Sequence, residues 1–208
     1  MIQFDNENPK SMAELLEKNT NIKIIAIGAS TGGTDAIASI VSALPAGLPG
    51  ILIVQHMPAD FTGMFANRLN SICSFPVWEA KNGDKISPNT ALVAPGELQL
   101  KVVRDADGGN SVNIYTGKKV SGHSPSVDVM FSSVAVAIGK YALGVILTGM
   151  GQDGAAGLLE MRRAGAVTIG QDEKSSIVYG MPKVAYDKGA VCYQMPLNQI
   201  SAKIQSLL

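Results

Sequence analysis

Three residues of this 208-residue chain could together carry out nucleophilic chemistry: Ser30, His56 and Asp153. A serine hydroxyl needs a neighbouring base to take its proton, and an acid that accepts the imidazole N–H keeps a histidine base in the correct tautomer. The chain contains only two histidines, His56 and His123, so one of them must be the base if Ser30 is a nucleophile. Whether the three side chains can meet depends on the strands and helices that carry them.

Ser30 follows a short apolar run rich in isoleucine, which is typical of a parallel strand buried on both faces. The turn Gly28-Ala29-Ser30-Thr31-Gly32-Gly33 then leads into a helical pattern that begins at Ala36. Ser30 would therefore lie at a helix N-terminus, where free N–H groups favour negative charge. Three interpretations of this turn are open: a phosphate cradle, a nucleophilic serine, or a helix cap.

His56 follows a second apolar run, residues 51 to 54, which one right-handed crossover would place parallel to the first. This strand would deliver His56 to the same edge of the sheet as Ser30, and the sites of open parallel sheets collect at that edge. His123 lies instead in a loop that leads into a helix. For a histidine taken alone, a solvated or hydrogen-bonded structural role is the alternative.

Asp153 lies in the glycine-rich loop 148–154, which follows a third buried run, residues 143 to 147. From there it could reach the edge that carries Ser30 and accept the N–H of His56. Capping of the helix that begins at Ala155 would also explain an aspartate at this position. Backbone N–H groups around Thr31 and Met150 lie in loops at helix starts and could supply an oxyanion hole.

The remaining patterns predict an α/β fold with a mostly parallel sheet, because strands alternate with helices. Short β-like runs occupy 75–80 and 90–96, and two alternating runs flank Asp107-Gly108-Gly109-Asn110, which predicts an antiparallel β-hairpin of 99–103 and 111–115 attached to the main sheet. Further strands are expected at 166–169 and 190–194, and helices at 127–135, 155–164, 182–187 and 197–208. Residues 1–21 are interpreted as a polar leader or linker, and 22–208 as one domain.

Composition excludes several classes of function. The 17 basic and 17 acidic residues cancel and form no long runs, so the chain lacks the electrostatic footprint of a protein that binds nucleic acid or anionic membranes. No apolar stretch approaches the about 20 residues of a membrane span, and the polar start is no signal peptide. Cys73 and Cys192 suit free thiols in a reducing compartment. We therefore expect a cytoplasmic protein. Its two histidines lack the spacing of metal ligands, so no metal site is expected.

Over about residues 22 to 207, the chain resembles the catalytic domain of CheB-type protein-glutamate methylesterases. The matching motifs are 28–33, Gln55-His56-Met57-Pro58, Pro125-Ser126-Val127-Asp128 and 144–154. The resemblance implies that Ser30 is the nucleophile, His56 the base and Asp153 the acid, with Thr31 and Met150 holding the oxyanion. It also implies a doubly wound, Rossmann-like three-layer sandwich with the hairpin at one edge, and an enzyme that needs no cofactor.

The implied substrates are γ-glutamyl methyl esters on the cytoplasmic helices of chemoreceptors, with deamidation of receptor glutamines as a second activity. His123 is expected to contact the substrate. Relatives often have an arginine beside this histidine, whereas Gly122 and Ser124 flank it here, so a cationic contact to an acidic receptor surface is expected to be missing. Family members commonly carry a phosphoacceptor receiver domain, which residues 1–21 are too short to form. A receiver domain absent from this chain is thus a further expected partner.

Two other functions stay open. The 28–33 turn superficially resembles that of a nicotinamide-binding short-chain dehydrogenase, and Tyr179 and Lys183 have Tyr-x-x-x-Lys spacing. Pro182 argues against this oxidoreductase, because its ring would interrupt the helical turn that must align the two side chains. No acid follows the second strand, where a ribose hydroxyl is usually bound. The other alternative is a non-catalytic receptor-binding module, against which the intact triad argues.

Overall fold

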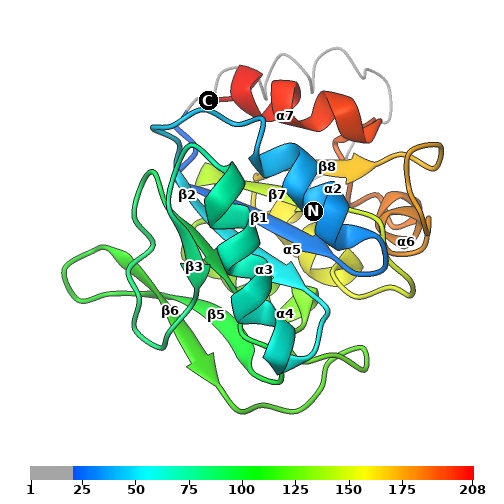
Figure 1. Ribbon diagram of the computed structural model, residues 1–208. Coiled ribbons are helices and arrows are strands. Elements are labelled where there is room, and N and C mark those ends of the chain that lie inside the picture. The colour runs from blue at the N-terminus through cyan, green and yellow to red at the C-terminus, as the bar shows by residue number, and fades with distance from the viewer. Residues whose placement is uncertain (1–20) are drawn as a thin grey trace, which may run out of the picture.

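A seven-stranded sheet forms the centre of the computed structural model, which describes residues 21–208 (Figure 1). The strand order is β3-β4-β2-β1-β7-β8-β9, and all the neighbouring strands of this sheet pair in parallel. The polar leader or linker expected at residues 1–21 lies outside the described residues, except for Asn21. The strands are β1 (Ile24–Ala29), β2 (Gly50–Gln55), β3 (Val77–Glu79), β4 (Ala91–Val93), β7 (Ala142–Ile146), β8 (Val167–Gln171) and β9 (Tyr193–Met195).

Helices cover both faces of this sheet. They are α2 (Gly33–Val41), α3 (Ala59–Ile72), α4 (Val127–Ala137), α5 (Ala155–Arg163), α6 (Met181–Asp187) and α7 (Leu197–Ser206), with a 3₁₀ turn at Gly139–Tyr141. One core cluster joins the sheet to α2, α3 and α7, and the other joins it to α4, α5 and α6. Ile25 and Ile27 of β1 belong to the first cluster, whereas Ile24 and Ala26 belong to the second, as the period of two requires. The predicted doubly wound α/β fold is confirmed.

Helix α3 is the element that the sequence analysis does not predict. Pro58 occupies the N-cap position of α3 with φ −61°. A proline is tolerated there, since the first N–H groups of a helix have no partner within the helix. The apolar side chains of α3 also form no clean stripe: Phe65 and Leu69 are buried, but Phe61 is exposed. This mixed exposure conceals the helical period.

The predicted hairpin consists of β5 (Gln99–Arg104) and β6 (Asn110–Tyr115), at the lower left of Figure 1. It forms a two-stranded sheet of its own and packs against α4, where the Val102 N–H donates to Ser133 Oγ at 2.9 Å. Strand β6 is also joined to the loop between β3 and β4, through the Lys85–Ser111 bridge and backbone hydrogen bonds such as that from the Gly83 N–H to Val112 O at 2.8 Å. The hairpin therefore packs beside α4, on the face of the main sheet that α4 covers.

The C-terminal elements differ from the prediction only at their ends. β9 begins at Tyr193 and not at Ala190, because the Ala190 N–H donates to Ala185 O and closes the end of α6.

Cys73 and Cys192 are both free. None of the helices within residues 21–208 combines the length and the apolar character that crossing a membrane requires.

Candidate active site

Ser30 and His56 are neighbours at the C-terminal edge of the sheet. β1 and β2 pair with Ala29 opposite Gln55, so the next residue of each strand comes to the same level. The His56 N–H donates to Ala29 O at 3.2 Å, and the Ser30 N–H donates to Thr148 O at 3.0 Å in the loop after β7. The ends of β1, β2 and β7 thus meet where the sequence places the candidate site.

His56 and Asp153 are joined by a short hydrogen bond. His56 Nε2 lies 2.7 Å from Asp153 Oδ2, and the two side chains are only 7% and 1% exposed. An ionised carboxylate can only accept, so Nε2 carries the proton and Nδ1 is the acceptor nitrogen of the ring. Nδ1 is buried and has no hydrogen-bond partner among the described residues. Ser30 Oγ therefore does not donate to it in this structure; such bonds often form only with bound substrate.

The carboxylate of Asp153 accepts four hydrogen bonds. Besides His56, its donors are Ser126 Oγ at 2.7 Å, the Val127 N–H at 2.7 Å and the Asp128 N–H at 3.1 Å. These three donors lie at the N-terminus of α4, where the helix dipole favours negative charge. Burial alone would raise the pKa of Asp153, but the four hydrogen bonds lower it below its ordinary value of 3.8. Asp153 is therefore ionised at neutral pH and can stabilise an imidazolium.

Capping of its own helix is not the role of Asp153. The N-cap of α5 is Gly154, which forms no side-chain cap, and the carboxylate caps α4 instead. Two glycines allow α4 to come this close: a Cβ at Gly28 or at Gly154 would overlap the side chain of Val127. Gly28 therefore serves the close approach of helix to strand.

Gln55 is a site residue that the sequence analysis overlooks. It is buried, and its Nε2 donates to Ser30 O at 2.9 Å and to His56 O at 3.1 Å. The glutamine thus joins the main chains of Ser30 and His56. A polar residue that ends an apolar strand was the signal, because a buried amide must find partners.

Thr31 and Met150 present free backbone donors beside Ser30. Neither N–H donates a hydrogen bond to any residue within 21–208. Thr148 Oγ1 donates to Thr31 O at 2.9 Å and so joins the two loops. A Cβ at Gly149 would lie 2.8 Å from the Cβ of Ser30, which shows how closely the loop after β7 approaches the serine. Two free N–H groups next to a candidate nucleophile are what an oxyanion hole requires.

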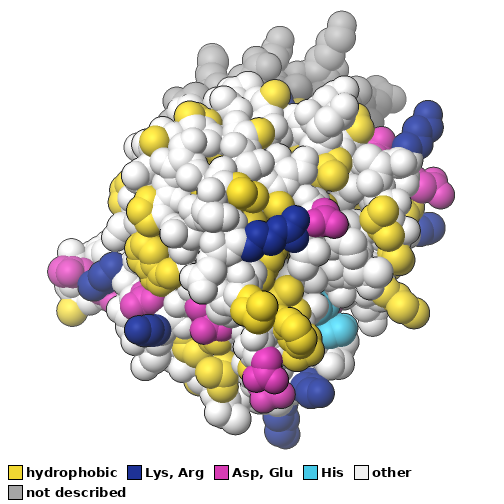
Figure 2. Space-filling model, in the orientation of Figure 1, with side chains coloured by type: hydrophobic (Ala, Val, Ile, Leu, Met, Phe, Trp, Pro, Cys, Tyr) yellow, Lys and Arg dark blue, Asp and Glu magenta, His cyan; other side chains and the backbone are white. Residues whose placement is uncertain are grey.

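His123 lies over the ring of His56. The ring centroids are 3.6 Å apart and the planes differ by 9°. Burial lowers the pKa of His123, and His56 and Lys119 lower it further, while Asp153 opposes the shift. Lys119 thus brings a positive charge near His123 although no arginine flanks the histidine. In Figure 2 a histidine is visible at the surface, next to hydrophobic side chains and above acidic and basic ones.

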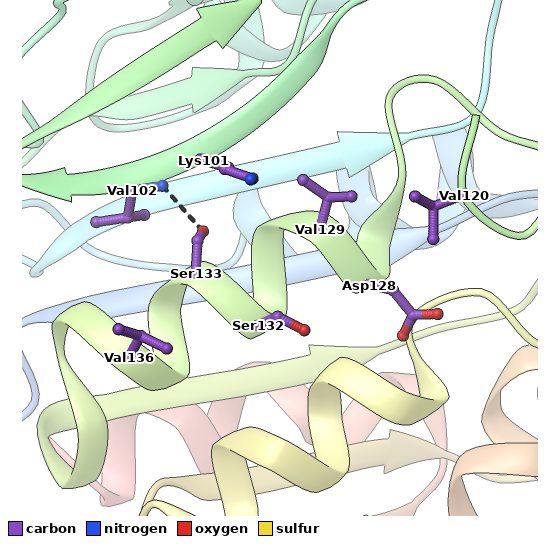
Figure 3. A pocket seen from close by; sticks show the side chains of 8 residues that line it. All are labelled: Lys101, Val102, Val120, Asp128, Val129, Ser132, Ser133 and Val136. Atoms are coloured by element: carbon purple, nitrogen blue, oxygen red, sulfur yellow. Dashed lines mark hydrogen bonds between the residues drawn. The ribbon is translucent and has the colours of Figure 1, made fainter. Parts of the chain in front are cut away.

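Two cavities are lined by residues other than Ser30, His56 and Asp153. A groove of about 430 Å³ runs between β5 and α4, and Asp128 and Ser132 line it from α4 (Figure 3). A cavity of about 590 Å³ is lined by the start of β1 and by Leu208. Ser30, His56 and Asp153 line neither of them, so the candidate site is part of the open edge of the sheet. Within residues 21–208, no cluster of three or more histidine, cysteine or carboxylate side chains could hold a metal ion.

The pair Tyr179 and Lys183 does not form the dehydrogenase arrangement. Helix α6 begins at Met181, so Tyr179 lies outside it. The Tyr179 hydroxyl accepts a hydrogen bond from Gln194, and Lys183 forms an ion pair with Asp187. Both side chains therefore have structural partners.

Comparisons with known proteins agree with this geometry. A family model described as CheB methylesterase matches residues 25–204. The protein-glutamate methylesterase/protein-glutamine glutaminase of Sulfurimonas denitrificans is 56% identical over 201 residues, which are 96% of this chain and 56% of the relative. A protein of the same name from Syntrophomonas wolfei is 55% identical over 185 residues, 89% of this chain and 54% of that protein. The chain thus spans about half the length of these curated relatives.

A solved structure is also similar. The crystal structure of the Thermotoga maritima CheB methylesterase catalytic domain superposes with a TM-score of 0.87 at 33% sequence identity. The match covers 90% of this chain and 99% of that one. From the family match and the superposition together, this chain belongs to the CheB methylesterase family.

Proposed function

We propose that this chain is a serine esterase that hydrolyses γ-glutamyl methyl esters on the cytoplasmic helices of chemoreceptors and also deamidates receptor glutamines. The names of the relatives support both activities. The observation that carries the proposal is the 2.7 Å contact of His56 Nε2 with Asp153 Oδ2 at the strand ends that also carry Ser30. It leaves the opposite ring nitrogen free to accept a proton.

In the proposed acylation step, Ser30 Oγ attacks the ester carbonyl while His56 Nδ1 takes the hydroxyl proton. Asp153 stabilises the resulting imidazolium, and the N–H groups of Thr31 and Met150 donate to the oxyanion of the tetrahedral intermediate. The intermediate collapses to a glutamyl ester of Ser30, and methanol leaves with the proton from His56. For a glutamine substrate the leaving group is ammonia.

In the deacylation step, water attacks the glutamyl ester of Ser30, and the same histidine takes one proton from that water. When the intermediate collapses, His56 returns that proton to Ser30 Oγ and glutamic acid is released, whose carboxyl group then loses the second proton of the water to solvent. Because this base serves both half-reactions, its ring must keep one orientation through the whole cycle.

The proposed partners follow from this activity. The substrates would be methylated chemoreceptor domains in the cytoplasm, where the enzyme would act. Since the curated relatives are about twice as long, a receiver domain outside the present chain is the second proposed partner.

A non-catalytic receptor-binding module is the competing function, and methanol release separates the two. Wild-type protein is expected to release methanol from methylated receptor, and Ser30→Ala to lose this by several orders of magnitude. Ser39→Ala, on the exposed side of α2, is the matched control and should keep wild-type activity. Receptor binding without methanol release by the wild type would favour the binding module.

A further inference from the structure

We propose that His123 is a positioning residue, which holds the ring of His56 in the orientation that proton transfer requires. This inference rests on the proposed function, because it assigns His56 the role of the base. It gives the second histidine a task other than contact with the substrate.

The ring of His56 is held on its edge and on its face by different residues. The Asp153 hydrogen bond fixes one ring atom, Nε2, but a ring held at one atom can still swing about that contact. The parallel ring of His123, with a centroid separation of 3.6 Å, restricts this swing. Both contacts together fix the direction in which Nδ1 points. A base misplaced by about 1 Å can lose about 100-fold in rate, so this control has kinetic consequences.

The turn that carries His123 is closed by backbone hydrogen bonds. Val120 and His123 exchange two backbone hydrogen bonds, at 3.0 and 2.9 Å. The two residues between them, Ser121 and Gly122, have φ angles of 51° and 85°. Positive φ at both central positions is the signature of a tight type I′ turn. His123 is therefore presented from a closed two-residue turn.

One buried side chain connects this turn to the support of Asp153. Gln99 Nε2 donates to Lys118 O at 3.1 Å and to His123 O at 3.2 Å. The same side chain accepts the Ser126 N–H at 2.9 Å through Oε1, and Ser126 Oγ donates to Asp153. The face partner and the edge partner of His56 are thus held by one short segment, residues 123–128, fastened to the start of β5.

The charges around the two rings suit this role. Burial, together with His56 and Lys119, lowers the pKa of His123, whereas Asp153 opposes them. His123 is consequently uncharged at neutral pH. A neutral ring can remain stacked while His56 takes up a proton, whereas a second imidazolium at this distance would repel it.

Substitutions of different shape test the inference. His123→Phe keeps a flat ring, so methyl ester hydrolysis should retain kcat and KM within about threefold of wild type. His123→Ala removes the ring and should lower kcat by about 10- to 100-fold while KM changes by less than about threefold. The cavity left by alanine could also destabilise the turn. His123→Leu controls for this, because it fills the volume without a flat ring. It should show the same loss of kcat as the alanine variant. Ser39→Ala is again the control.

A spectroscopic readout keeps this test separate from the proposed function. The Nε2 proton of His56, hydrogen-bonded to Asp153, should give an NMR signal in wild type and His123→Phe that broadens or disappears in His123→Ala and His123→Leu. A raised KM with unchanged kcat in His123→Ala would assign His123 to substrate contact and overturn the inference. Equal kinetic damage in the phenylalanine and alanine variants would also overturn it. Absence of esterase activity in the wild type would refute the proposed function, while the NMR comparison would still decide whether His123 orients His56.

Discussion

The carboxylate of Asp153 accepts the backbone N–H of Val127 at 2.7 Å, so it caps the helix α4 and not α5, which directly follows it in the chain. The same carboxylate oxygen lies 2.7 Å from His56 Nε2. One carboxylate therefore connects the start of α4 to the proposed catalytic base. Changes at Asp153 should consequently alter stability and activity together.

Asp153→Asn should reduce both. An amide offers one acceptor oxygen where the carboxylate offers two, so at least one buried donor loses its partner. Leaving it unpaired should lower the free energy of unfolding by about 1–3 kcal/mol. Methyl ester hydrolysis should fall by about 10⁴-fold, the order known for the same change in a serine protease triad. Urea unfolding and methanol release measure the two effects, and Asp35→Asn, in an exposed ion pair with Arg68, is the control.

The stabilisation by Asp153 should depend on pH with a definite sign. Its folded-state pKa is lowered below 3.8, so the stabilisation is present above 3.8 and is lost as the pH falls through the lowered value. The difference in unfolding free energy between wild type and Asp153→Asn should therefore be nearly constant from pH 7 to pH 5 and should shrink below pH 4. A difference that is the same at pH 7 and pH 2.5 would contradict an ionised Asp153.

His123 should make the folded protein less stable in mild acid. Its folded-state pKa is lowered below 6.5, so below pH 6.5 the unfolded chain binds a proton that the folded chain does not. The wild type should lose stability between pH 7.5 and pH 5.5 relative to His123→Phe, by at most about 1.4 kcal/mol per pH unit. Chemical unfolding of both proteins at the two pH values measures this. Parallel losses in the two proteins would exclude a depressed pKa.

Gly28→Ala should disturb the site indirectly, through the side chain of Val127. The new methyl group would overlap Val127 and push away the start of α4, with a loss of about 1–3 kcal/mol in the free energy of unfolding. Activity should fall too, because Asp153 is bound by that start. Gly63→Ala is a matched control: it lies within α3, its Cβ would be 3.6 Å from Glu79 Oε2, and it should be neutral or stabilising by up to about 1 kcal/mol. Thermal unfolding of both variants checks the contrast.

A serine-directed fluorophosphonate should react at Ser30. The free N–H groups of Thr31 and Met150 would hold its phosphoryl oxygen, as they would an oxyanion. Peptide mass spectrometry should find one adduct on residue 30, formed much more slowly in His56→Gln because members of a triad act as a unit. An adduct at another serine would refute Ser30 as the nucleophile.

The positions of Ser30 and His56 could be predicted because local patterns determine them. Isoleucine-rich runs predict buried strands, and parallel pairing then brings the strand ends to one edge. Helix α3 escaped prediction because Phe61 and other apolar residues on it face outwards. The support of Asp153 and the stacking of His123 on His56 could not be predicted either. Both depend on the docking of 123–128 against Gln99 of the separate hairpin, which no local period encodes.

Two of the four hydrogen bonds to Asp153 come from main-chain amides, which nineteen of the twenty residue types supply. Sequence drift at positions 127 and 128 therefore leaves the donors intact, so long as side-chain size does not shift the helix. Proline is the exception. Proline is ordinarily tolerated at the first position of a helix, since the N–H there has no partner within the helix. At position 127 that N–H donates to Asp153, so a substitution that is harmless at most helix starts would here remove a hydrogen bond from the proposed catalytic acid.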